Sequence, residues 1–151
     1  MITVIAVGKK HEDWVSDGIK RYQTRCKQPW SFEWRLIPHS KLDGQQARQE
    51  ESERILARLH PQDFVILLDE RGQIFDSTAL SRQLNELFAQ SKNIIIVIGG
   101  AFGVSTELTR RADLVWSLSL LVFPHQLVRL ILAEQLYRAQ EIARGSKYHH
   151  Q

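Results

Sequence analysis

Two basic residues in the last third of the chain, His125 and Arg129, have the spacing of a joint site. They lie four residues apart and therefore share one face of the helix that we expect to begin at Pro124. Leucine, isoleucine and alanine surround Arg129, and burying an unpaired guanidinium is costly, so the sequence predicts an acidic or phosphate partner for it. A structural ion pair with Glu134 of a second subunit, or with Asp69, is the alternative to a phosphate.

A glycine-rich stretch, residues 99–103, follows an apolar run and precedes Ser105, which is a good helix N-cap. It lacks the spacing of a dinucleotide fingerprint, and no Gly-Lys-Ser/Thr follows that would make it a phosphate-binding P-loop. Ligands of open α/β sheets bind outside the carboxyl ends of the strands. The stretch therefore fits either a tight turn or a loop that lets a ligand approach the backbone.

Two more segments could border a ligand. Asp69 closes another apolar run, where it caps the strand, contacts a neighbouring loop or takes part in catalysis. Residues 116–125 form an apolar run with two serines that reaches a helix without Gly, Asn or Asp. This pattern fits an extended, partly buried loop whose free backbone groups could hold a flat heterocycle such as adenine, or an edge strand running into a helix.

The C-terminal residues 145–151 have the composition of a frayed tail, but Tyr148 and His149 are also groups that a proton-transfer tail would contain. The other histidines, His11, His39 and His60, are scattered near the ends of expected elements. With no Cys-x-x-Cys, no His-x-x-x-His and no acidic cluster at ligand spacing, the sequence predicts no metal site.

Five short apolar runs rich in β-branched residues are expected to form strands, at residues 2–7, 32–37, 64–68, 94–98 and 114–116. The third and fourth do not alternate with polar residues, which predicts a parallel sheet with helices on both faces. Helical spacing fills the gaps between the runs, so the fold class is α/β. We interpret residues 1–151 as a single domain and the polar residues 40–54 as a loop leading into a solvated helix face.

The composition bounds the compartment and the partners. The chain has 151 residues, one cysteine, and a net charge of +3 from 20 Lys and Arg against 17 Asp and Glu. A lone cysteine is typical of a reducing compartment, so we expect a cytoplasmic protein, and the mild basic charge permits a nucleic-acid partner. The apolar runs are too short for a membrane helix, and the first one has no basic segment ahead of it, as a signal peptide would.

The last helix, expected over residues 124–144, is apolar almost all round. Its apolar residues occupy both halves of a helical wheel: Leu127, Val128, Ile131, Leu132 and Leu136 on one, and Leu130, Ala133 and Tyr137 on the other. A surface helix needs only one apolar face. The sequence therefore predicts that the second face meets another copy of the chain in a homodimer.

Several short motifs in a fixed order resemble one family. They are Leu68-Asp69, Ile98-Gly99-Gly100-x-x-Gly103, Trp116-Ser117-Leu118-Ser119, Pro124-His125-x-Leu127-Val128-Arg129, Glu134-Gln135-Leu136-Tyr137-Arg138-Ala139 and Tyr148-His149. Over the whole chain the sequence is similar to the SPOUT-class ribosomal RNA large-subunit methyltransferase H family. Members of this bacterial family methylate N3 of a pseudouridine in large-subunit ribosomal RNA.

The resemblance implies a parallel α/β sheet with a C-terminal trefoil knot, in a homodimer that uses S-adenosyl-L-methionine and no metal on the rRNA of the ribosome. It also implies site residues. Those matching positions near the substrate are His125, Arg129, Tyr148 and His149, and those matching the cofactor site are Leu68, Gly100, Leu118, Ser119, Leu120, Leu121, Val122 and Phe123.

Two other classes of function remain open, a catalytically silent RNA-binding dimer and a flavodoxin-like small-ligand regulator. The glycine-rich stretch together with the apolar loop after residue 116 favours a cofactor over RNA binding alone. The lack of an acidic cluster near the strand ends argues against a regulator that receives a phosphoryl group.

Overall fold

The computed structural model describes residues 1–150, and its strands form one five-stranded parallel sheet. In chain order the strands are β1 (Ile2–Val7), β2 (Phe32–Ile37), β3 (Phe64–Gln73), β4 (Ile94–Ile98) and β5 (Leu114–Trp116). Across the sheet their order is β2-β1-β4-β3-β5, and every neighbouring pair is parallel. The predicted parallel α/β arrangement is confirmed, with the expected bounds for every strand except β3.

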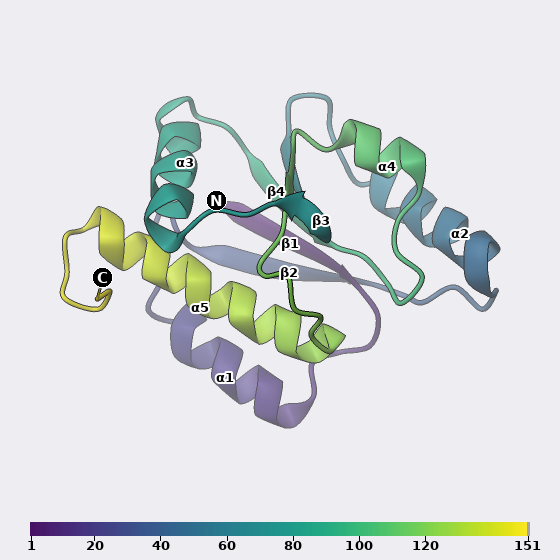
Figure 1. Cartoon of the computed structure of the whole chain (residues 1–151), viewed down its shortest axis with the longest axis horizontal. Helices are drawn as coiled ribbons and strands as arrows, with labels where there is room; N and C mark the ends of the chain where they lie inside the picture. Colours follow the sequence, from purple (N-terminus) through teal and green to yellow (C-terminus); the bar gives the residue numbers. More distant parts are fainter. Residues whose placement is uncertain (151) are drawn as a thin grey trace.

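Helices cover both faces of the sheet (Figure 1). Alternate residues of β1 point to opposite faces, so Ile2 and Val4 lie in one apolar cluster while Ile5 and Val7 lie in the other. The first cluster is closed by α1 (Asp13–Gln23), α3 (Ser77–Ala89) and α5 (His125–Ala143), and the second by α2 (Gly44–Leu56) and α4 (Thr106–Arg111). β1 and β4 are buried along their whole length, which is why their sequences do not alternate.

Strand β3 continues past its expected end at Leu68 as far as Gln73. It pairs with β5 at Leu68 and again at Gln73, with an irregularity between the two. Gly72 allows the backbones to approach this closely, because a Cβ there would lie 2.6 Å from the carbonyl oxygen of Val115. Asp69 therefore lies within a bulged strand and not at a strand end.

Helix α2 occupies most of the segment that was expected to be a loop before a solvated helix. It begins at Gly44, whose φ of 52° is in the left-handed region that glycine tolerates. Ala47, Glu51, Ser52 and Ile55 are buried on its inner face. The interpretation of this segment as solvated is therefore correct only for the outer face.

Helix α5 lies between α1 and α3, and part of its second apolar half is already covered within the chain. Leu130 packs on Gly18 of α1, where a Cβ would lie 2.7 Å from the Cδ1 of Leu130. The rings of Tyr137 and Tyr22 are 5.9 Å apart. Leu130 and Tyr137 are therefore partly covered within the chain, where Gly18 leaves room for α1 to approach Leu130, and contact of this half with a second copy stays a prediction.

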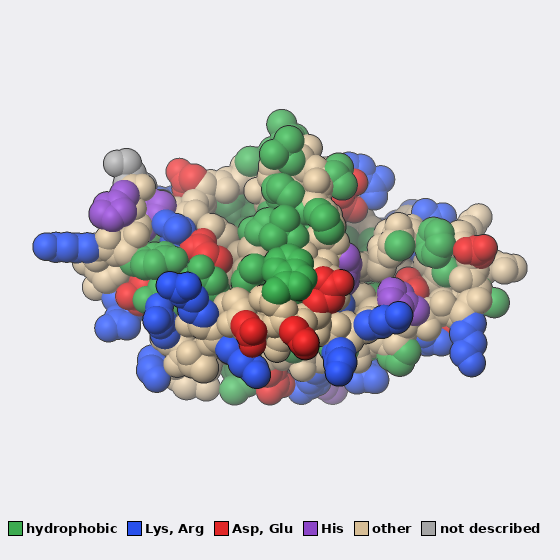
Figure 2. Space-filling view, turned by 90° about the horizontal axis from the view of Figure 1, so that it is seen from below, with side chains coloured by type: hydrophobic (Ala, Val, Ile, Leu, Met, Phe, Trp, Pro, Cys, Tyr) green, Lys and Arg blue, Asp and Glu red, His purple; other side chains and the backbone are tan. Residues whose placement is uncertain are grey.

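The three most exposed large apolar side chains are consecutive in the sequence and lie outside this half of α5. Leu120, Leu121 and Val122, in the loop before α5, are 79%, 68% and 81% exposed. Hydrophobic side chains form a band through the middle of one face of the molecule (Figure 2). Exposed apolar patches of this kind mark contact surfaces.

Within the described residues, no helix has both the length and the hydropathy needed to cross a membrane.

Candidate active site

A cavity of about 470 Å³ lies at the carboxyl edge of the sheet, next to the ends of β4 and β5 and the bulge of β3. Its walls are the segments 68–71, 98–104 and 118–123, with His125 and Val128 of α5. The structure thus brings together most of the expected cofactor residues: Leu68, Gly100, Leu118, Ser119, Leu121, Val122 and Phe123. Leu120 does not line the cavity, since it points outward at the tip of its loop.

The glycine-rich stretch is both a tight turn and a wall of this cavity. The amide of Gly103 donates to the carbonyl of Gly100 at 3.1 Å, and Gly103 has a φ of 78°. A side chain is excluded at Gly99, because its Cβ would lie 2.7 Å from Cγ1 of Val104. Both alternatives left open by the sequence are therefore compatible with one structure.

The segment after β5 is an irregular loop held by its two serines. The hydroxyl of Ser117 donates to the carbonyl of Ser119 at 2.8 Å, and the hydroxyl of Ser119 accepts from the amide of Leu121 at 3.0 Å. β5 itself is an edge strand. The run therefore combines the two structures expected for it, a short edge strand and then a loop.

Asp69 lines the cavity and is paired within its own strand. Its carboxylate accepts from the amide, Nε and Nη2 of Arg71 at 2.8, 3.1 and 3.0 Å. The hydrogen bond from the Arg71 side chain lowers the pKa of Asp69, so this carboxylate is ionised at neutral pH. The predicted ion pair between Asp69 and Arg129 is wrong, because Arg71, two residues away, holds both carboxylate oxygens.

His125 stands at the start of α5 with its ring against the glycine-rich turn. Its Nε2 is 2.9 Å from the carbonyl oxygen of Gly99. Burial, and then the positive charge of Arg129, lower the pKa of His125 below its ordinary value of 6.5, so the ring is neutral at pH 7. A carbonyl can only accept, so Nε2 carries the proton, and the lone pair of Nδ1 has no hydrogen-bond donor among residues 1–150. The site thus contains a neutral imidazole with a proton acceptor.

Arg129 is completely buried behind His125. Its Nη1 donates to the carbonyl of Lys9 at 2.8 Å and lies 3.1 Å from Nδ1 of His11, and its Nη2 donates to the carbonyl of Val7 at 3.4 Å. Within residues 1–150 no acidic side chain pairs with Arg129, so the predicted acidic partner is wrong, whereas the phosphate partner stays a prediction. The carbonyl groups at the end of β1 present the negative ends of their dipoles to the guanidinium, in place of a carboxylate.

The predicted ion pair between Arg129 and Glu134 of a second subunit is not needed either, since Glu134 is bound to the tail. Its carboxylate pairs with Arg138 at 3.0 Å and accepts from the hydroxyl of Tyr148 at 3.1 Å. The Arg138 guanidinium lies 4.8 Å above the Tyr148 ring, and its Nη1 is 3.1 Å from Nδ1 of His149. Tyr148 and His149 are thus docked on α5 and are not a frayed end.

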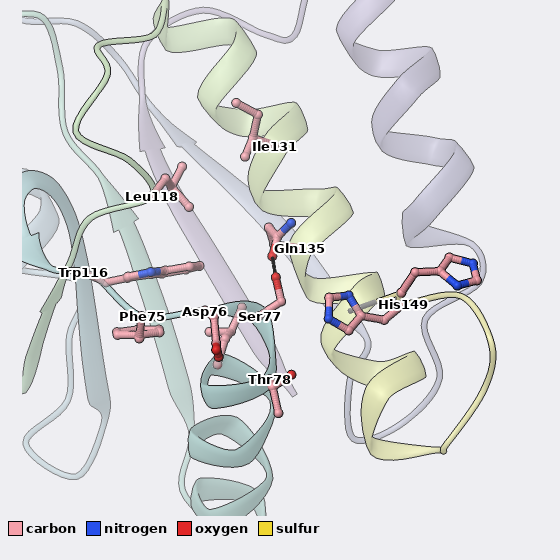
Figure 3. Close-up of a pocket in the computed structure, with 11 residues that line it drawn as sticks. Phe75, Asp76, Ser77, Thr78, Trp116, Leu118, Ile131, Gln135 and His149 are labelled. Atoms are coloured by element: carbon pink, nitrogen blue, oxygen red, sulfur yellow. Dashed lines mark hydrogen bonds between the residues drawn. The ribbon is translucent and has the colours of Figure 1, made fainter.

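This docked tail lies at a second cavity, of about 620 Å³, whose lining includes Trp116, Gln135 and His149 (Figure 3). Leu118 lines both cavities. Within one chain the structure therefore places His125 on one cavity and the tail on the other. It does not bring the four expected substrate-side residues together.

Sequence reasoning missed Glu51, which is 3% exposed beside the glycine-rich turn. The available signal was the spacing of Ala47, Glu51 and Ile55, four residues apart, which places an acidic residue on the apolar face of a helix. It also missed the tail-binding role of Glu134 and Arg138. Within residues 1–150 no group of three His, Cys, Asp or Glu side chains is arranged to hold a metal ion.

The lowered pKa values of His11 and His125 predict how stability depends on pH. Burial is the main cause of both shifts, followed by Arg129. Below pH 6.5 these two histidines bind protons more readily in the unfolded chain than in the folded protein. The free energy of unfolding therefore falls as the pH drops below 6.5. We expect urea unfolding to show this loss between pH 7 and about 5.5.

Replacing His125 with Asn should reduce that pH dependence, because one of the two groups no longer titrates. His60→Asn, at an exposed position, is the matched control and should leave the slope as in the wild type. An unchanged slope in the His125 variant would contradict the assignment of a depressed pKa to this residue.

Known proteins with sequences similar to this chain belong to a family that is consistent with the geometry of the site. The sequence matches the family model described as predicted SPOUT methyltransferase over residues 1–149. It is 40% identical over 156 residues to ribosomal RNA large subunit methyltransferase H of Desulfitobacterium hafniense, covering 98% of each chain. It is 41% identical over 152 residues to the protein of that name from Dichelobacter nodosus, covering 98% of this chain and 97% of the relative.

The fold also has a match among solved structures. A methylase family protein from Neisseria gonorrhoeae superposes with a TM-score of 0.53 at 11% identity, covering 99% of this chain and 86% of the other. This likeness concerns the fold alone. The match to the family model and the near full-length relatives carry the assignment: the chain belongs to the SPOUT methyltransferase family, and within it to the ribosomal RNA large subunit methyltransferase H proteins.

Proposed function

We propose that the protein transfers a methyl group from S-adenosyl-L-methionine to N3 of a pseudouridine in large-subunit rRNA, on assembled ribosomes in the cytoplasm. The observation that carries the proposal is the cavity at the carboxyl edge of the sheet, where three loops meet a neutral His125 in a chain of this family. The relatives' names, which specify large-subunit rRNA, support the substrate class.

The cavity fits the cofactor in size and in lining. A volume of about 470 Å³ is within the range of small-molecule sites. The residues that would hold it are the expected set, chiefly Leu68, Gly100 and residues 118–123. Gly99 and Gly100 bring bare backbone to the cavity wall, where the ion pair of Asp69 and Arg71 also lies. When bound, the cofactor supplies a methyl group on a positively charged sulfur.

We include the trefoil knot and the obligate dimer of the family in the proposal. The segments that follow β4 and β5 and the bulge of β3 converge on one cavity, which is the region where the knot loops would lie. The two groups of site residues, His125 and the tail, are both attached to α5. A second copy packed along this helix offers a way to complete the site.

The chemistry requires a proton acceptor, because N3 of a uracil-like ring carries a proton at neutral pH. The Nδ1 lone pair of His125 would accept that proton as N3 becomes methylated, and the cofactor, when bound, would supply the methyl group. Arg129, behind His125, sets the electrostatic environment of the His125 ring. Tyr148 and His149 hold the pseudouridine base in position. Orientation of N3 in line with the methyl carbon supplies much of the remaining acceleration.

The test is methyl incorporation from labelled S-adenosyl-L-methionine into ribosomes that lack the modification, followed by mass spectrometric mapping of the methylated nucleoside. A 3-methylpseudouridine in large-subunit rRNA is the expected product. Ribosomes that carry uridine in place of the pseudouridine are the control. Cofactor binding without incorporation into any rRNA would overturn the proposal in favour of a silent RNA-binding protein.

A homodimer is the expected state in solution. Light scattering should give about twice the chain mass of 17.5 kDa at micromolar concentration, because Leu120, Leu121 and Val122 expose apolar surface that a partner would cover. Leu120→Glu, in the exposed loop before α5, should shift the mass towards one chain, whereas Leu42→Glu, at an exposed apolar residue before α2, should not. A wild-type mass of one chain would contradict the dimer.

A further inference from the structure

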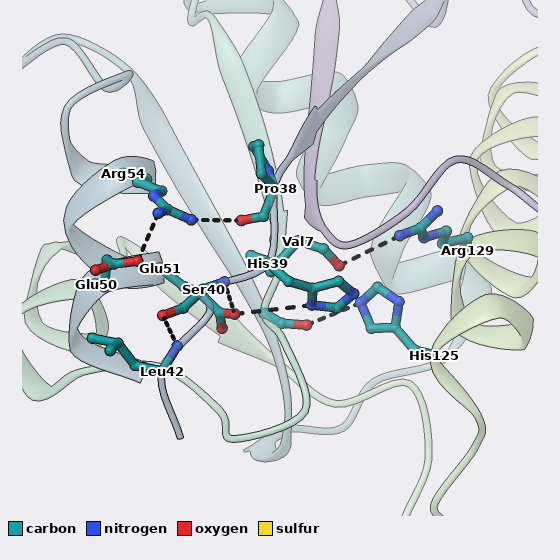
Figure 4. A network of polar contacts seen from close by, with 11 residues as sticks. Val7, Pro38, His39, Ser40, Leu42, Glu50, Glu51, Arg54, His125 and Arg129 are labelled. Carbon is teal, nitrogen blue, oxygen red and sulfur yellow. Dashed lines mark hydrogen bonds and ion pairs between the residues drawn. The ribbon is translucent and has the colours of Figure 1, made fainter. Parts of the chain in front are cut away.

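Glu51 of α2 is a buried carboxylate that the proposed reaction does not use (Figure 4). Its Oε2 accepts from the amide of Ser40 at 2.9 Å and lies 3.9 Å from Nδ1 of His39. These contacts tie α2 to the loop of residues 38–43, which follows β2. A carboxylate that is 3% exposed is costly to bury, and one backbone hydrogen bond, with the His39 ring at 3.9 Å, satisfies only one of its oxygens.

The other oxygen, Oε1, has no hydrogen-bond partner among residues 1–150. It lies directly beside the glycine-rich turn, since a Cβ on Gly100 would be 2.5 Å from it. Gly100 lines the 470 Å³ cavity and Glu51 does not, so the carboxylate touches the turn from behind. A buried acceptor without a donor is costly, and this one lies against a turn whose backbone amides are potential donors.

The loop of residues 38–43, which Glu51 holds, also borders the buried guanidinium of Arg129. The His39 ring lies on Gly8, where a Cβ would be 3.1 Å from Nε2 of His39 and 3.2 Å from Nη2 of Arg129. Gly8 has a φ of 129°, in a region that side chains avoid. One oxygen of Glu51 is therefore in contact with the glycine-rich turn at residues 99–103. The other oxygen contacts the loop of residues 38–43, which borders Arg129.

We propose that Glu51 is a positioning residue of the methyl-transfer site. Its free Oε1 accepts a backbone N–H of the turn at residues 99–103 when the cofactor occupies the cavity, while Oε2 keeps the loop after β2 in place. The hydrogen bond that is missing in the free protein is formed in the complex, and its free energy adds to cofactor affinity. This inference rests on the proposed function only in its choice of cofactor.

Glu51→Gln is the first test, with Glu53→Gln as the matched control on the exposed side of the same helix. The amide oxygen of the introduced glutamine still accepts from Ser40, which directs its NH₂ group, a donor, at the turn. We expect unchanged urea unfolding without cofactor but about tenfold weaker binding of S-adenosyl-L-methionine by calorimetry, with a smaller change in the rate at saturating cofactor. Wild-type affinity in Glu51→Gln would overturn the positioning role.

A pair of substitutions tests the contact itself. Gly100→Ala places a methyl group on Oε1 and should weaken cofactor binding at least tenfold. In a Glu51→Ala background the same substitution meets no carboxylate and should have a much smaller effect, which a double-mutant cycle measures. Equal effects in both backgrounds would overturn the proposal. A wild-type protein that binds cofactor but does not methylate ribosomes would overturn the proposed function and leave the Glu51 result standing.

Discussion

A chain that ends at Ser146 should bind S-adenosyl-L-methionine as well as the full chain does, yet methylate ribosomes ~100-fold more slowly or worse. The deletion removes Tyr148 and His149, which contact Glu134 and Arg138 of α5 and contribute nothing to the cavity that holds His125. The expected loss is that of an orienting or proton-transfer group. Cofactor affinity should be spared because every wall of that cavity is retained.

Labelled methyl incorporation into purified ribosomes, with calorimetry on the same preparations, measures the two effects separately. Lys147→Ala in the full-length chain is the control, because Lys147 is exposed and the tail remains attached. Near-normal transfer by the shortened chain would show that docking of Tyr148 and His149 on α5 has no part in the reaction.

Replacing Arg129 with Ala should lower the free energy of unfolding by about 3 kcal/mol or more. The side chain is completely buried, and the carbonyl oxygens of Val7 and Lys9 and the Nδ1 of His11 would lose their donor. A cavity would add to that cost, since alanine fills little of the space left by a guanidinium.

Urea unfolding at pH 7 measures the loss, with Arg110→Ala on the exposed surface of α4 as the control. The variant should also raise the pKa of His125, since the charge of Arg129 is one cause of its depression. A stability within 1 kcal/mol of the wild type, about the scale of a single hydrogen bond, would contradict the structural role assigned to this arginine.

Local sequence pattern predicts much of this fold because the strands are buried on both faces. The unbroken apolar runs at residues 64–68 of β3 and 94–98 of β4 are best accommodated in a parallel sheet that is covered on both faces. The same pattern could not show that β3 continues beyond Leu68. That extension depends on Gly72 meeting the backbone of Val115, a contact between residues distant in sequence.

The loops that line the candidate site could be predicted from the sequence, whereas the hydrogen-bond and ion-pair partners of its charged side chains could not. Segments at the carboxyl ends of strands must meet at one edge of the sheet, so Leu68, Gly100 and residues 118–123 except Leu120 converge as expected. The partner of Arg129 was not predictable, because backbone carbonyls leave no signal in the sequence. The burial of Glu51 was missed because the polar residues around it conceal the helical spacing.

The order of strands in the sheet has a consequence for synthesis of the protein. The first strand to leave the ribosome, β1, occupies an inner position and pairs with β4, Ile2 opposite Ile94, so one of its edges stays open until more than half of the chain has emerged. The apolar faces of α1 and α3 wait longer still, because both pack on α5, the last helix made. A nascent chain of this protein therefore carries uncovered apolar surface until α5 has emerged, which favours binding of chaperones during synthesis.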